Sequence, residues 1–237
     1  MKNKKIIGIT GANGTLGKSL TKVFQNKGYQ IIGFTHTKNK KVLNTNGPTE
    51  WVYWECGKEY LLKEYLKKID ILILNHGIYE QDPKNSDFEK ALSVNALSKL
   101  KILNLFKEIA FQHENEIYPK EIWINTSEAE ILPALSPSYE ISKSLIGSLV
   151  TFQNNFLSDN DRKKLFIRKI IIGPFKSELN PIGIMDPNIV AFLIFYISKI
   201  KVNLIIVTPN PLTFIIFPLK ELYYFFYYNL VKFLKRE

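Results

Sequence analysis

The stretch KKIIGITGANGTLGKSL, residues 4–20, carries the strongest structural signal in the chain. A short apolar run leads into Gly11, Gly14 and Gly17, and a helical pattern follows at once. Such a loop turns tightly and lets backbone N–H groups at a helix N-terminus approach a phosphate that side chains would obstruct. Its place between a first strand and a first helix predicts a dinucleotide-binding loop, with a plain turn and helix cap as the alternative.

Outward from this loop, short apolar runs alternate with helical patterns along the chain. The runs show little hydrophobic alternation, which is typical of parallel strands covered on both faces. We predict an α/β fold: a doubly wound parallel β-sheet with helices on both faces, or Rossmann fold, in one domain over 1–215. An aromatic, basic C-terminal helix over 216–237 follows it. The predicted strands are 4–10, 31–34, 69–75, 121–127, 165–173 and 204–208. The predicted helices are 16–27, 61–68, 88–111, 139–156 and 189–200.

The composition indicates a folded chain in a reducing compartment. A chain of 237 residues with 46% hydrophobic residues can bury a substantial core. A single cysteine, Cys56, excludes an internal disulfide and a multi-cysteine metal site, and it suits a reducing, cytoplasmic compartment. The basic, then apolar N-terminus resembles a signal peptide, but the apolar run is short and lacks a cleavage site, so a first strand is expected.

The net charge of +10 has two readings. The lysines can be spread over solvated faces, or they can attract an anionic partner such as a phosphorylated cofactor, acidic lipid headgroups or nucleic acid. Because no nucleic-acid motif occurs and the positive charges are scattered, nucleic acid is not expected as a partner.

The residues at the end of the second predicted strand indicate which dinucleotide, NAD or NADP, the chain prefers. An acidic residue there would bond the adenosine ribose of NAD, but the chain reads GFTHTKNKK, with Thr35 and His36 at that point. Lys38, Lys40 and Lys41 follow, and no carboxylate is present to repel a 2′-phosphate. NADP is therefore favoured over NAD, unless these lysines are merely exposed on a loop.

Tyrosine and lysine recur four positions apart in SPSYEISKSLIG, residues 136–147. A second such pair, Tyr228 and Lys232, shows that the spacing alone is weak evidence. On a helix, Lys143 lies on the face of Tyr139, and its charge favours the phenolate form needed for proton exchange. We expect Ser136 to cap this helix, with Pro137 at its first position.

Several motifs occur in a fixed order: the glycine loop, NHG at 75–77, VNA at 94–96, NTS at 125–127 and YEISK at 139–143. Together they resemble the short-chain dehydrogenase/reductase family over roughly residues 4–215. The stretches NTSEAEILPALSPSYEISK and GPFKSELNPIGIM are most similar to the dehydrogenase half of proteins that join a sterol-desaturase-like membrane domain to a short-chain dehydrogenase. This order singles out Tyr139, because Tyr228 follows the last predicted strand.

The resemblance implies a catalytic set. Tyr139 would be the general acid/base, Lys143 its activator, Ser127 the donor that polarises a carbonyl, and Asn95 the organiser of a proton-relay water. It also implies a cofactor site with no metal. That site would comprise Gly11, Asn13, Gly14, Thr15, Leu16, Gly17, Thr35, His36, Lys38, Glu55, Asn75, His76, Gly77, Tyr139, Lys143, Gly173, Pro174 and Ser177.

The chain departs from the family pattern in places. The glycine spacing G-x-x-G-x-x-G is more typical of relatives that act on nucleotide sugars. Ser127 stands one residue closer to Tyr139 than is usual, which leaves Thr126 as a rival hydroxyl. Gly173-Pro174 reverses the usual order, and His76 replaces a small residue, for which packing or cofactor contact is expected rather than titration.

The C-terminal tail contains six aromatic residues in a row, from Tyr223 to Tyr228. Six consecutive helical positions point in every direction, so one core-facing stripe cannot bury them all. Peripheral membrane contact, a homo-oligomer interface and burial against the protein itself are the three readings. Prolines interrupt the uncharged stretch 202–219, which argues against a transmembrane helix.

The leading functional prediction is an NADP-preferring oxidoreductase. It would transfer hydride between the cofactor and a carbonyl or secondary alcohol, on a lipophilic small molecule if the tail is interfacial. It would work in the cytoplasm or at the membrane surface, as a homo-oligomer. The alternatives are a non-catalytic nucleotide-binding sensor or membrane-associated partner and, ranked lower, a nucleotide-sugar epimerase or dehydratase. The short segment after Ser177 leaves little room for a sugar nucleotide.

Overall fold

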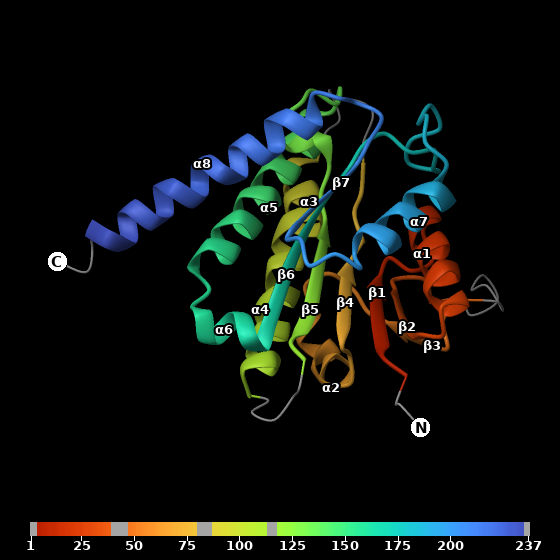
Figure 1. Cartoon of the computed structure of the whole chain (residues 1–237). Helices are drawn as coiled ribbons and strands as arrows, with labels where there is room; N and C mark the ends of the chain where they lie inside the picture. Colours follow the sequence, from red (N-terminus) through yellow and green to blue (C-terminus); the bar gives the residue numbers. More distant parts are fainter. Residues whose placement is uncertain (1–3, 39–46, 80–86, 113–117, 235–237) are drawn as a thin grey trace.

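The computed structural model describes residues 4–38, 47–79, 87–112 and 118–234 (Figure 1). Within these residues seven strands form one sheet in the order β3-β2-β1-β4-β5-β6-β7, and each neighbouring pair is parallel. The strands are β1 (Ile6–Thr10), β2 (Gln30–Thr35), β3 (Glu50–Tyr53), β4 (Ile71–Leu74), β5 (Lys120–Asn125), β6 (Leu165–Ile172) and β7 (Leu204–Val207). The α-helices are α1 (Thr15–Asn26), α2 (Lys63–Lys67), α3 (Phe88–Leu92), α4 (Ser98–Gln112), α5 (Pro137–Phe156), α6 (Asp159–Lys164), α7 (Pro187–Ile197) and α8 (Thr213–Leu234).

Two hydrophobic cores lie on opposite faces of the sheet, because successive strand residues point to opposite sides. In β4, Ile71 and Ile73 pack with α1 and α7, whereas Leu72 and Leu74 pack with α2, α4 and α5. All four side chains are buried. The predicted doubly wound parallel sheet is thus confirmed, and its strands lack alternation because both faces are covered.

The sequence missed two elements. The edge strand β3 is four residues long, and Val52 is the one residue of it that is buried, so it carries little apolar signal. Helix α6 has no buried residue and is defined by its capping box, in which Ser158 and Asp161 bond each other's backbone N–H.

Two helices differ in detail from the prediction. The helix expected over 88–111 is divided into α3, a π-helical turn at Ser93–Leu97, and α4. Helix α5 has Pro137 in its first turn as expected. Ser136 stands at its N-cap, but its side chain makes no capping hydrogen bond, contrary to expectation.

Helix α8 leaves the end of the molecule where the strands finish, passes α5, and extends outward beyond the body (Figure 1). Of its 22 residues, all described, Thr213 and Phe217 alone are buried. Tyr228 packs edge-on against Phe152 and Phe156 of α5, with ring centroids 5.8 and 5.2 Å away. None of the described helices, α8 included, is long and apolar enough to cross a bilayer.

A buried cluster of charges fixes the base of α8. Glu130 is fully buried and accepts hydrogen bonds from Lys169 of β6 at 2.6 Å and from Lys220 of α8 at 2.8 Å. Lys169 also bonds Glu221 of α8 at 2.8 Å and Thr151 of α5 at 3.0 Å. The cluster therefore ties together three elements and the short 3₁₀ turn Glu128–Glu130 that follows β5.

Candidate active site

The glycine loop packs so closely that side chains are excluded from it. Gly11 has a φ of +64°, and a Cβ there would lie 2.9 Å from the Cα of His76. A Cβ on Gly17 would overlap the Gly11 carbonyl oxygen. Gly14 at the N-cap of α1 supplies no capping side chain, and the first turn of α1 has no acidic residue. First-turn N–H groups lack partners within a helix, so this end of α1 suits an anion.

Asparagines connect the glycine loop to the ends of neighbouring strands. The Asn75 amide donates to the Gly11 carbonyl at 3.4 Å, and the Asn125 amide donates to Asn75 at 2.9 Å. Among the described residues, the buried amide oxygens of Asn13 and Asn125 have no hydrogen-bond partner. Buried polar atoms normally have one, so these two, beside the glycine loop, fit a bound dinucleotide.

The predicted 2′-phosphate region holds a carboxylate, contrary to expectation. Lys38 lies 3.5 Å from Glu55, and Glu55 also bonds Lys58 at 3.0 Å. The Tyr53 hydroxyl donates to the same carboxylate. The Tyr53 and Lys58 contacts lower the pKa of Glu55 to about 2. Glu55 is thus ionised and engages Lys38, while Lys40 and Lys41 lie outside the described residues.

A cavity of about 540 Å³ opens where β4, β5 and β6 end. It is lined by predicted site residues from separate parts of the chain: Leu16, Asn75, Gly77, Ser127, Tyr139, Lys143, Gly173, Pro174 and Ser177. This is the crevice at the carboxyl ends of parallel strands where open α/β sheets bind ligands. Of the predicted residues, Thr35, His36, Lys38 and Glu55 lie apart from this cavity, at or just beyond the ends of β2 and β3. The remaining predicted residues do not line it either: Gly11, Asn13, Gly14, Thr15, Gly17, His76 and Asn95.

Tyr139 and Lys143 lie on the first turns of α5. The Lys143 ammonium is 5.2 Å from the centre of the Tyr139 ring, and Lys143 is buried. Tyr79 packs edge-on against Tyr139 with centroids 5.0 Å apart, and its hydroxyl donates to the Ala134 carbonyl at 3.0 Å. Both tyrosines line the cavity, so the phenol of Tyr139 is presented to any ligand there.

The two rival hydroxyls differ in what they bond. Thr126 is buried and donates to the Ile170 carbonyl of β6 at 3.3 Å. Ser127 instead accepts from the Ala129 N–H at 3.2 Å, which leaves its own proton available for donation. This arrangement favours Ser127 as the donor toward a substrate oxygen.

Asn95 lies in the π-helical turn, and its side chain connects two segments of the site through hydrogen bonds. Its side-chain oxygen accepts from the Ile78 N–H at 2.8 Å, and its amide donates to the Ile78 carbonyl at 3.0 Å and to Ser142 at 2.9 Å. Ser142 in turn bonds the Tyr139 carbonyl at 2.8 Å. Asn95 therefore joins the segment after β4 to the turn that carries Tyr139, and π-turns of this kind are frequent at functional sites.

Two buried bases lie beneath the cavity. His76 Nδ1 is 2.7 Å from the Thr10 hydroxyl, and its ring packs edge-on against Trp54. Burial and the charges of Lys99 and Lys143 hold the pKa of His76 well below 6.5. Lys99 is fully buried, donates to the Asn125 carbonyl at 2.8 Å, and has a pKa well below 10.5 because of burial and Lys143. His76 is accordingly neutral, and among the described residues its buried Nε2 has no hydrogen-bond partner, so packing and cofactor contact, the two expected roles, both fit.

The outer rim of the cavity is apolar and exposed. We use the name apolar rim for Leu135, Leu179, Ile182 and Ile184, all of which line the cavity. Leu135, Ile182 and Ile184 are 81%, 84% and 72% exposed. The segment after Ser177 is short, as expected, and folds back on itself through a bridge between Phe175 and Met185.

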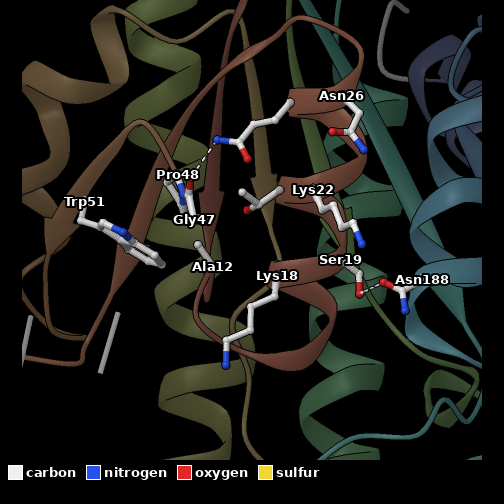
Figure 2. Close-up of a pocket in the computed structure, with 11 residues that line it drawn as sticks. Ala12, Lys18, Ser19, Lys22, Asn26, Gly47, Pro48, Trp51 and Asn188 are labelled. Atoms are coloured by element: carbon white, nitrogen blue, oxygen red, sulfur yellow. Dashed lines mark hydrogen bonds between the residues drawn. The ribbon is translucent and has the colours of Figure 1, made fainter. Parts of the chain in front are cut away.

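A second hollow, of about 410 Å³, lies between α1 and the segment that precedes β3 (Figure 2). Lys18 and Lys22 line it together with Pro48 and Trp51. None of the residues predicted for catalysis or cofactor binding lines this hollow, so it is separate from the candidate active site.

Sequence reasoning missed several residues that the structure brings to the site, among them Tyr79, Glu128 and Lys99. Tyr79 and Glu128 line the cavity, and Lys99 lies beneath it. Lys99 follows Asn95 by one helical turn, a spacing that could have indicated it. Nothing in the local sequence marks Tyr79 or Glu128. Among the described residues no group of three or more His, Cys, Asp or Glu side chains could hold a metal ion.

The fold and the site together define a dinucleotide-binding protein of the short-chain dehydrogenase fold. The short-chain dehydrogenase from Burkholderia cenocepacia in complex with NADP superposes with a TM-score of 0.73 at 15% identity, covering 86% of this chain and 88% of that one. The short-chain dehydrogenase from Sphingobium yanoikuyae in complex with NADPH gives 0.72 at 14% identity, covering 87% and 88%. The bulky-bulky ketone specific alcohol dehydrogenase from Comamonas testosteroni gives 0.70 at 15% identity, covering 86% of each.

The family follows from sequence. The profile of the NAD dependent epimerase/dehydratase family matches residues 7–147, and the chain belongs to this family. A nicotinamide dinucleotide is therefore its cofactor class. The chain is also 38% identical over 233 residues to the monoglucosyldiacylglycerol epimerase of Synechocystis sp.. That match covers 97% of this chain and 55% of the relative, so the chain spans about half the relative's length.

Proposed function

We propose that this chain interconverts the epimers of a sugar carried by a lipid, through reversible hydride transfer at a secondary hydroxyl. The observation that carries the proposal is the joint placement of Ser127, Tyr139 and Lys143 in one cavity with an apolar rim. The similarity to a glycolipid epimerase supports the choice of reaction and substrate class.

The roles of the residues follow from their contacts. Tyr139, whose ring centre lies 5.2 Å from the Lys143 ammonium, accepts the proton of the sugar hydroxyl, and Ser127 donates a hydrogen bond to the same oxygen as it becomes a carbonyl. The nicotinamide supplies reversible acceptance of the hydride from the same carbon. Inversion requires the keto sugar to turn over in the cavity, so that the same carbon presents its opposite face to the nicotinamide, and Tyr139 then returns the proton to the oxygen. Protons and electrons balance, so the net change is inversion of one carbon without oxidation.

Epimerisation was the lower-ranked expectation, because the short segment after Ser177 leaves little room for a sugar nucleotide. A lipid-linked sugar removes this objection, since the nucleotide is absent and the lipid chains can remain outside the site. The exposed side chains of Ile182 and Ile184 suit such chains.

The sequence resembles the dehydrogenase half of desaturase fusion proteins, whereas the curated relative that it matches is an epimerase. The match covers 55% of the relative, so the relative carries further sequence that the match does not include. We propose that a desaturase-like membrane partner takes the place of that further sequence.

The test uses the purified chain with monoglucosyldiacylglycerol in detergent micelles and NAD or NADP. The released sugar is identified by chromatography after hydrolysis, and net cofactor reduction is followed by absorbance. We expect a new epimer of glucose to form without net reduction, and to be absent with Tyr139→Phe. Equal conversion by wild type and Tyr139→Phe would overturn the proposal.

A plain reductase is the second candidate, and the structural likeness to a ketone-specific alcohol dehydrogenase supports it. This candidate predicts carbonyl formation with stoichiometric cofactor reduction, and preference for NADP if Lys38 can meet the 2′-phosphate. A chain that binds the nucleotide but converts nothing would favour the non-catalytic sensor.

A further inference from the structure

We infer that α8 and the apolar rim form one membrane-docking surface, which lays the protein on a lipid bilayer with the mouth of the cavity toward the lipid. The inference about docking stands on the burial and charge of α8. Its link to catalysis rests on the proposed function.

The first observation is the surface of α8. Large apolar or aromatic side chains are exposed along the whole helix: Phe214, Ile215, Leu219, Leu222, Tyr223, Phe225, Phe226, Tyr227, Leu230, Phe233 and Leu234. An apolar patch of this extent on a protein marks an interaction surface. Figure 1 shows that α8 runs past α5 and outward from the body, and in its outer half the stripe with Tyr228 and Lys232 contacts α5 while the other side chains remain exposed.

The second observation is the arc that these residues cover. The exposed positions include the neighbours Leu222 and Tyr223, and the run Phe225 to Tyr227, so they span much more than one helical stripe. A partner helix covers a stripe of roughly 100°. Helix α5 already takes the stripe that contains Tyr228. Lipid can cover a wider arc, because it adapts to any side of the helix that the protein leaves open.

The third observation is the distribution of charged side chains on α8. Glu221 is the one acidic residue of α8, and Lys169 and Thr151 bond its carboxylate. The exposed surface of the helix therefore presents no free carboxylate to repel an anionic headgroup. Lys232 lies in its last turn, and the sequence continues with Lys235, Arg236 and Glu237, which adds two cationic side chains and one acidic one. Tyrosine hydroxyls and terminal cations around an apolar helix match the interfacial zone of a bilayer.

The fourth observation is continuity with the cavity. Asn210, just before α8, lines the cavity. Glu128, which also lines it, accepts hydrogen bonds from Thr208 at 2.6 Å and from Thr213 in the first turn of α8. The helix thus begins at the cavity wall. A bilayer in contact with α8 would lie beside the mouth, where a lipid-linked sugar could enter without leaving the bilayer.

The experiment is flotation of the full chain with vesicles of phosphatidylcholine alone and with added phosphatidylglycerol. The test variant is Tyr223→Ser/Phe226→Ser/Phe233→Ser on α8. The matched control is Tyr60→Ser/Leu61→Ser/Tyr118→Ser, whose side chains are similarly exposed but lie on other elements. Thermal unfolding and nucleotide binding confirm that both variants fold.

We expect wild type and the control to float with vesicles, more strongly when phosphatidylglycerol is present. The α8 variant should partition at least about tenfold less, because three interfacial side chains are lost. Wild type that remains in solution with both vesicle types, or an α8 variant that floats like wild type, would overturn the inference. A dimer that the α8 substitutions convert to monomer, with no wild-type flotation, would assign the surface to a second copy.

Different results would overturn the epimerase proposal and the membrane-docking proposal. Flotation without conversion of monoglucosyldiacylglycerol would leave the docking surface and overturn the epimerase. Conversion in micelles without flotation would overturn the docking surface and leave the epimerase proposal standing.

Discussion

At the scale of single residues, the two tyrosine–lysine pairs provide a matched comparison within one chain. Tyr139→Phe should lower turnover by about 10²–10⁴-fold, since it removes the proton acceptor. Nucleotide binding should be nearly unchanged, because the ring and its packing against Tyr79 remain. Tyr228→Phe, the control, has the same spacing to a lysine but lies on α8. Similar losses in both variants would show that the effect is structural.

The Lys38–Glu55 pair sets up a test of cofactor preference. Glu55→Gln removes the carboxylate that engages Lys38 at 3.5 Å, and with it a charge that repels a 2′-phosphate. We expect the ratio of NADPH to NADH affinity to rise several-fold, measured by nicotinamide fluorescence at fixed salt. Glu64→Gln breaks an exposed pair with Lys67 on α2 and should leave the ratio unchanged. An unaltered ratio in Glu55→Gln would remove Lys38 from the cofactor site.

His76 makes stability depend on pH. Its folded-state pKa is well below 6.5, so between that value and 6.5 the unfolded chain binds more protons than the folded one. The free energy of unfolding therefore rises with pH in this window and falls on acidification, by up to about 1.4 kcal/mol per pH unit. The groups that oppose protonation are Lys99 and Lys143, and Thr10 holds the ring.

His76→Gln should flatten this slope between about pH 5.5 and 6.5, measured by urea unfolding. The comparison concerns the slope, since the substitution also changes packing against Trp54. A variant whose slope equals that of wild type would place the titration elsewhere.

Site residues that belong to a sequence motif could be predicted, whereas residues that only the fold brings to the site could not. Tyr139, Lys143 and Ser127 come from motifs in a recognisable order, and the cavity brings them together. The engagement of Lys38 by Glu55 could not be foreseen, because it arises from the parallel pairing of β2 with β3. Tyr79 likewise reaches Tyr139 only through the fold of the segment after β4.

At the scale of elements, α5 is kept close to the buried charges by a glycine. A Cβ on Gly147 would overlap the Glu130 carboxylate, which bonds Lys169 and Lys220. Gly147→Ala should therefore destabilise the protein by about 2–4 kcal/mol, although alanine favours helix. Ser148→Ala, the control at the neighbouring exposed position, should be neutral or slightly stabilising. Equal stability of the two variants, by denaturant unfolding, would contradict the packing described for Glu130.

The helices and strands that bury much apolar surface were predictable from the sequence, and those that bury little were not. The central strands β1, β4 and β5 read clearly from sequence, because nearly every residue in them is buried. Edge strand β3 buries one residue and helix α6 buries none, so hydrophobic patterning could not find them. The π-helical turn depends on the side-chain bonds of Asn95, which have no periodic signal.

At the scale of the whole molecule, α8 and the sheet form one unit through buried charges. Truncation after Leu212 would remove Lys220, Glu221 and Thr213, and leave Lys169 bonded to Glu130 and Thr151 alone. We expect such a chain to melt at a temperature several degrees lower or to be recovered insoluble. Calorimetry beside the full-length serine variant of α8 separates this effect from lost apolar surface. A truncated chain as stable as wild type would show that the cluster does not depend on α8.

The strand order has a consequence for synthesis on the ribosome. After β4 pairs with β1, each later strand adds to the same edge of the sheet in chain order, β5, then β6, then β7. The glycine loop can therefore close against its neighbours before Tyr139 is translated, and the edge of β5 stays open until residue 165 or later emerges. Long-range parallel pairing is slow, and open edges favour aggregation. The nascent chain is thus most vulnerable while α5 is being made, which is the stage at which a chaperone would matter most.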